Sequence, residues 1–117
     1  GQVRRLITIG TPFRGTWVGA VGLPVLGPIS RGIWQTLPTS DVVREMVEQG
    51  APSGVQTTSI SMKGDLLCAP SRCRLQGADH VVLGGLPTIL THQYLVLSRA
   101  AFEAAHRCLV EPDRAAA

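Results

Sequence analysis

Long apolar runs, aromatic residues and cysteines are all scarce in this chain of 117 residues. No uninterrupted apolar stretch reaches the ~18 residues of a membrane span, because glycine and proline break the richest segment, Trp17 to Ile29. Aromatic residues make up only 4% and no basic stripe interleaves with them, which argues against nucleic acid as a partner. Three cysteines, Cys68, Cys73 and Cys108, are too few for a disulfide scaffold and lack the spacing of a zinc site. We therefore expect no membrane span, no nucleic-acid partner and no metal.

What the sequence does contain is the composition of a folded domain. Hydrophobic residues make up 44% and charged residues 16%, which argues against disorder. The length suffices for one modest domain with its own core. Two states of Cys68 and Cys73 stay open: a local disulfide in an oxidising compartment, or two free thiols. The compartment, secreted or cytoplasmic, stays open as well, because we expect any signal peptide to lie before Gly1.

Strand-like and helix-like stretches alternate along the chain. The apolar or alternating pattern of strands occurs at Val3–Ile9, Val55–Met62 and Val81–Leu83. Amphipathic stretches predict helices near residues 41–49 and 93–108. The apolar side of the second helix is predicted to carry Leu95, Phe102, Ala105 and Leu109. This alternation predicts an α/β fold in which helices flank a parallel sheet.

Residues 17–38 keep no clean helical or strand period. They are apolar, rich in glycine and proline, and hold both tryptophans, Trp17 and Trp34. One interpretation is an irregular loop packed against the domain. The other is a cap or lid whose apolar side meets a substrate.

The central strand ends in a turn that carries an acidic residue. Val55–Met62 runs into Lys63-Gly64-Asp65, which places the Asp65 carboxylate at the strand's carboxyl end. In open α/β sheets this edge is where ligands and catalytic groups gather. Asp79 and His80 are adjacent at the start of the next strand, so they point to opposite faces, and we interpret both as solvated turn residues. His92 follows that strand through a loop and precedes the last helix.

Two motifs resemble a known family. The stretch Leu-Ile-Thr-Ile-Gly-Thr-Pro-Phe-Arg-Gly-Thr, residues 6–16, resembles the strand and loop that follow the nucleophile helix in bacterial triacylglycerol lipases and related α/β hydrolases. His92-x-x-Leu-Val-Leu-Ser98 is similar to the segment of that family that carries the catalytic histidine. The chain departs from the family at Phe13, where His is common, and in about four extra loop residues, including Pro87, before His92.

The resemblance implies a fold, a function and two site residues. It implies the C-terminal half of an α/β-hydrolase fold over residues 1–117, with a cap or lid at 17–38 and a tail at 111–117. The implied activity is carboxylic-ester hydrolysis, by a lipase or esterase acting on a lipid or other ester without a cofactor. Asp65 and His92 have the chain order of the second and third members of a Ser-His-Asp triad.

The nucleophile of such a triad has no counterpart in this sequence. Gly-x-Ser-x-Gly, the motif that carries it, does not occur, so we expect the nucleophile to lie before Gly1 and the chain to be inactive alone. A sheet edge exposed at Val3–Ile9 would then invite self-association. The alternative function is a non-catalytic α/β-hydrolase-like piece that serves as a binding or interaction module.

Overall fold

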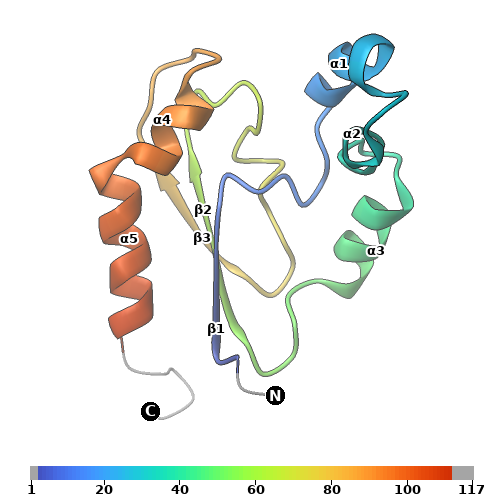
Figure 1. Ribbon diagram of the computed structural model, residues 1–117. Coiled ribbons are helices and arrows are strands. Elements are labelled where there is room, and N and C mark those ends of the chain that lie inside the picture. The colour runs from blue at the N-terminus through green and yellow to red at the C-terminus, as the bar shows by residue number, and fades with distance from the viewer. Residues whose placement is uncertain (1–2, 112–117) are drawn as a thin grey trace.

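The computed structural model describes residues 3–111 and places eight elements along the chain. In chain order they are β1 (Arg5–Ile9), α1 (Val18–Leu26), α2 (Arg31–Gln35), α3 (Asp41–Gln49), β2 (Gln56–Met62), β3 (Asp79–Leu83), α4 (Thr91–Leu97) and α5 (Arg99–Val110). Figure 1 shows α4 and α5 on one side of the strands and α1 to α3 on the other. The expected tail at 111–117 lies outside the described residues, apart from Glu111.

The three strands form a parallel sheet in the order β1-β2-β3. This confirms the predicted α/β class, with a parallel sheet flanked by helices. The central strand β2 is the most buried, because it has a neighbour on each side and is covered on both faces. All three strands run the same way, so their carboxyl ends meet at one edge of the sheet.

One face of the sheet packs against α4 and α5 around a small core. The fully buried members are Ile60, Met62, Leu95, Ala101 and Ala104. Small alanines let the α5 backbone approach the strands closely. Arg5 of β1 also donates hydrogen bonds to the carbonyl groups of Cys108 and Leu109 and so caps the carboxyl end of α5.

The prediction of the last helix is wrong in its continuity and in half of its buried side, since Leu95 and Ala105 pack in the core but Phe102 and Leu109 are exposed. The segment is two helices, α4 and α5, which meet at Ser98, whose hydroxyl accepts a hydrogen bond from Ala101 N at 3.1 Å. The break shifts the helical phase, so Ala101 and Ala104 face the sheet while Phe102 is 69% exposed. Leu95 is buried as predicted, but it belongs to the other helix.

Two further expectations need correction. Residues 17–38 are not an irregular loop throughout, since α1 and α2 lie within them, with Pro24 inside α1. Asp79 and His80 are not turn residues, because β3 begins at Asp79. By contrast, the helix predicted near 41–49 matches α3, where the Ser40 hydroxyl accepts a hydrogen bond from Val43 N at 3.2 Å. Within residues 3–111, no helix is both long and apolar enough to cross a membrane.

Candidate active site

A tight turn after β2 positions Asp65. Gly64 has φ +82°, a conformation that favours glycine, and a Cβ at this position would lie 2.4 Å from the Leu86 carbonyl oxygen. The backbone of the turn is therefore in direct contact with the loop that leads to α4. Asp65 itself pairs with Thr88 of that loop through an isolated parallel bridge.

The Asp65 carboxylate is buried and firmly held. The residue is only 2% exposed. Its Oδ1 accepts hydrogen bonds from the backbone N–H groups of Leu67, at 2.9 Å, and Cys68, at 2.8 Å. These two bonds, a local Asp-to-backbone turn, compensate the cost of removing the carboxylate from water. They leave Oδ2 available for a different partner.

That partner is His92, in the first turn of α4. Its Nδ1 lies 2.7 Å from Asp65 Oδ2, and because an ionised carboxylate can only accept, Nδ1 carries the proton and donates it. The His92 side chain is 31% exposed, and no group within residues 3–111 hydrogen-bonds its Nε2. The imidazole is thus oriented through one nitrogen and open through the other.

Gly10, just beyond the end of β1, lies beneath the imidazole. A Cβ there would be 3.0 Å from His92 Cε1 and 3.3 Å from His92 Nδ1. Glycine at this position therefore makes room for the ring, as well as adopting φ +61°. The carboxyl ends of β1 and β2 and the start of α4 converge on one site, and the longer loop before His92 does not prevent this.

The other two histidines are placed differently. His80 is exposed on β3, and its Nε2 accepts a hydrogen bond from Leu75 N at 3.1 Å. His106 stacks on Phe102 of α5, with ring centroids 6.2 Å apart. The structure brings together the predicted pair, Asp65 and His92.

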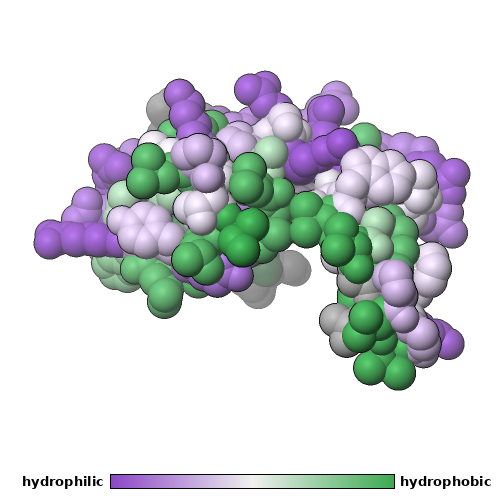
Figure 2. Space-filling view, turned by 90° about the horizontal axis from the view of Figure 1, so that it is seen from above, coloured by the Kyte–Doolittle hydropathy of each residue, from purple (hydrophilic) through white to green (hydrophobic). Residues whose placement is uncertain are grey.

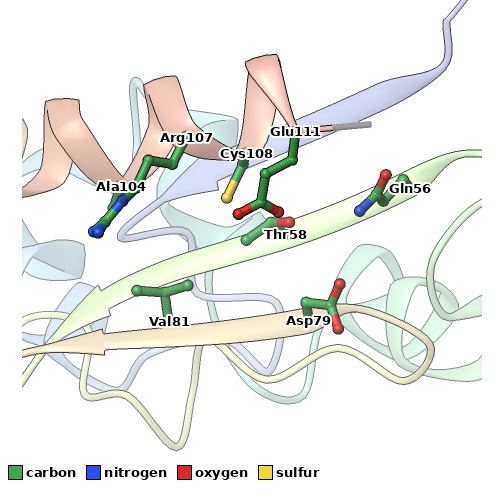
Figure 3. A pocket seen from close by; sticks show the side chains of 8 residues that line it. All are labelled: Gln56, Thr58, Asp79, Val81, Ala104, Arg107, Cys108 and Glu111. Atoms are coloured by element: carbon green, nitrogen blue, oxygen red, sulfur yellow. The ribbon is translucent and has the colours of Figure 1, made fainter. Parts of the chain in front are cut away.

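A hollow of about 270 Å³ lies at the edge of the sheet opposite to Asp65 and His92 (Figure 3). Residues at the amino ends of β2 and β3 and in the last turns of α5 line it: Gln56, Thr58, Asp79, Val81, Ala104, Arg107, Cys108 and Glu111. It is therefore remote from the carboxyl ends of the strands, where Asp65 and His92 meet. Within residues 3–111, no group of three or more His, Cys, Asp or Glu side chains could hold a metal ion.

Two buried thiols lie next to the Asp65 turn. The Sγ atoms of Cys68 and Cys73 are 3.1 Å apart, and both cysteines are free. The hydrogen bond with Cys73, together with burial and the nearby Asp65 charge, raises the pKa of the Cys68 thiol. The same hydrogen bond lowers the pKa of Cys73. Burial and the nearby Asp65 charge act on the pKa of Cys73 in the opposite direction.

Sequence reasoning identified the two side chains but missed the groups that hold them. The backbone N–H groups of Leu67 and Cys68 and the space above Gly10 are parts of the site. After a strand, an Asp side chain commonly accepts hydrogen bonds from backbone N–H groups two and three residues later. The position of Asp65 after β2 was therefore a sequence signal for these two donors. The site as built can accept a proton at Nε2 and stabilise the resulting imidazolium.

No protein-family model, no curated protein and no solved structure matches this chain.

Proposed function

We propose that this chain provides the acid and the base of a Ser-His-Asp triad in a carboxylic-ester hydrolase, a lipase or esterase of the α/β-hydrolase fold. The observation that carries the proposal is the 2.7 Å contact between His92 Nδ1 and the buried Asp65 carboxylate. The resemblance of residues 6–16 and 92–98 to bacterial lipases supports the same conclusion independently of that distance.

In the proposed reaction His92 acts as general base through Nε2. It takes the proton from a serine hydroxyl while the serine oxygen attacks the ester carbonyl, and Asp65 stabilises the imidazolium that forms. Collapse of the tetrahedral intermediate expels the alcohol, which receives the proton back from Nε2, and leaves an acyl-enzyme. Water then repeats the same two proton transfers and releases the acid. No metal or organic cofactor takes part.

The serine would come from a segment outside this sequence. No serine hydroxyl within residues 3–111 hydrogen-bonds His92. Strand β1 has β2 as its only neighbour among the described strands, and Gly10 at its carboxyl end touches the His92 ring. A further parallel strand beside β1 would therefore end close to Nε2, where a nucleophile is needed.

Apolar surface around the site favours a lipid-like ester. Figure 2 looks onto the end of the molecule where α4 and α1 lie, and apolar side chains gather on both parts, with a hollow between them. The described apolar side chains with the largest exposed fractions belong to α1, α4 and the loops beside them: Val21, Val25, Ile29, Leu86 and Leu97. Such surface suits an acyl chain better than a peptide or a sugar.

A second candidate function is a non-catalytic module of the same fold that binds a partner. The open Nε2 of His92, without a nucleophile among the described residues, favours it. The two candidates differ in whether a serine ever completes the site.

The experiment that separates them begins with the reading frame that encodes this chain. Expressed as a whole, that protein should hydrolyse p-nitrophenyl butyrate, and a fluorophosphonate should label one serine in a Gly-x-Ser-x-Gly motif. The 117-residue chain alone should give neither signal. A frame without such a serine, or a folded full-length protein without labelling, would favour the binding module.

A further inference from the structure

The loop that follows Asp65 contains a second chemical feature, the buried pair Cys68 and Cys73. Their exposed fractions are 2% and 1%, and their Sγ atoms lie 3.1 Å apart. A disulfide needs an S–S bond of about 2.05 Å, so an approach of about 1 Å by side-chain rotation would suffice. Cys108 is remote from both, near the capped end of α5.

Each cysteine is anchored to a different part of the site. The backbone N–H of Cys68 donates a hydrogen bond to Asp65 Oδ1 at 2.8 Å. Together with the N–H of Leu67 it forms what we call the Asp65 cradle. The carbonyl of Cys73 accepts a hydrogen bond of 2.8 Å from the Ser59 hydroxyl, in the middle of β2. Between them two local turns close the loop, Arg72 N to Ala69 O at 2.8 Å and Cys73 N to Pro70 O at 3.2 Å. The loop is also held to the segment after β1, because Arg14 N donates a hydrogen bond to Arg72 O at 3.0 Å.

We propose that Cys68 and Cys73 are a site of reversible disulfide formation, and that the bonded form fixes the Asp65 cradle to the central strand. A covalent link would run from Ser59-anchored Cys73 to Cys68, and from there through one hydrogen bond to the carboxylate that orients His92. This inference goes beyond the proposed hydrolase function and does not depend on it, because it concerns the geometry of the loop.

The oxidant is an organic disulfide, and the exchange balances. The Cys73 thiolate attacks one sulfur of that disulfide, whose S–S bond breaks, and one organic thiol leaves with the electron pair and takes up a proton. Cys68, after losing its proton, attacks Cys73 Sγ in the mixed disulfide and expels the second organic thiol. Two cysteine thiols are oxidised and one organic disulfide is reduced to two thiols. The hydrogen bond with Cys68 lowers the pKa of the Cys73 thiol, which suits Cys73 as the first nucleophile.

The loop gives the oxidant a route to the two sulfurs. Leu66 is 53% exposed and Ser71 is exposed, so this segment lies at the surface although both thiols face inward. A brief local opening exposes them without unfolding the sheet.

Oxidised glutathione and mass spectrometry test the bond itself. Trypsin cuts after Lys63, Arg72 and Arg74, so a Cys68–Cys73 disulfide joins peptides 64–72 and 73–74. After oxidation, alkylation of the denatured chain should label only Cys108, and a reductant should restore labelling of all three cysteines. A linked peptide pair that includes Cys108, or free Cys68 and Cys73 after oxidation, would overturn the proposal.

Amide hydrogen exchange tests the effect on the cradle. In the oxidised chain the amide protons of Leu67 and Cys68 should exchange about tenfold more slowly than in the reduced chain. Cys108→Ser should keep this difference, and Cys73→Ser should abolish it. If Cys73→Ser does not fold, the oxidised and reduced forms of the unaltered chain supply the comparison. Equal exchange in those two forms would show that the disulfide does not act on Asp65.

Discussion

The chain contains two Asp and His pairs, and they are built in opposite ways. Asp79 and His80 are neighbours in sequence but alternate along β3, so they point to opposite faces. Asp79 lines the hollow under α5 (Figure 3), and His80 does not. Asp65 and His92 are 27 residues apart, yet their side chains meet at 2.7 Å. A strand separates its neighbours, whereas the carboxyl edge of a parallel sheet gathers residues from distant loops.

The environments of the two pairs differ as much as their positions. Asp65 is 2% exposed and its Oδ1 is satisfied by two backbone N–H groups, so burial, orientation and charge act together on His92. His80 is exposed and only accepts a hydrogen bond from the backbone of Leu75. Only the first pair therefore has the arrangement of a general base with its orienting acid.

Loss of the His92 imidazole should have the largest effect. If the proposed ester hydrolase is correct, His92→Ala in the full-length protein should lower kcat by on the order of 10⁶-fold, because the base that accepts the serine proton is lost. Hydrolysis of p-nitrophenyl butyrate by purified variants measures this, with His80→Ala as the matched control that keeps near wild-type turnover. Wild-type rates with His92→Ala would refute the assignment of the base.

Asp65→Asn should be the second most severe change. The amide keeps an oxygen to accept from Leu67 N and Cys68 N, but its NH₂ cannot accept the Nδ1 proton of His92. The imidazole is then held in the wrong tautomer, and kcat should fall by about 10⁴-fold. Steady-state kinetics measures the fall in kcat, and circular dichroism confirms that the variant is folded. A change in KM with an unchanged kcat would contradict this prediction.

Gly64→Ala should destabilise the turn that brings the pair together. Alanine is strained at φ +82°, and its Cβ would also lie 2.4 Å from the Leu86 carbonyl oxygen. We therefore expect the free energy of unfolding to fall by about 2–5 kcal/mol. Gly54→Ala is the matched control, because it has φ +75° but no atom within 4 Å of the Cβ, and should lose only about 1–2 kcal/mol. Urea unfolding of both variants measures the difference. Equal losses would mean that the Leu86 contact is unimportant.

His80→Ala should have the smallest effect of the four. It leaves the Leu75 N–H without its acceptor at 3.1 Å, and because the site is at the surface, water replaces part of that bond. We expect a loss of about 1 kcal/mol in unfolding free energy and no change at Asp65. Urea unfolding gives the first quantity and the His92 resonances give the second. Movement of those resonances would show that the two pairs are coupled.

The sequence was sufficient for the parallel sheet, for α3 and for the contact between Asp65 and His92, because period, turn chemistry and chain order can be read from the sequence. It was insufficient for α1 and α2, where glycine and proline hide the helical period. The buried side of α5 was misjudged because the break at Ser98 resets the phase, and this turned Phe102 outward. The contact of Gly10 with the His92 ring depends on packing between distant segments, which no local pattern records.

The most direct test of the central claim is the tautomer of His92 in the 117-residue chain itself. Histidine labelled with ¹⁵N, observed by long-range proton–nitrogen correlation, separates an imidazole protonated at Nδ1 from one protonated at Nε2. We predict that neutral His92 carries its proton on Nδ1, with a low-field proton resonance that disappears in Asp65→Asn. A neutral His92 protonated at Nε2, or a spectrum unaffected by Asp65→Asn, would contradict the account.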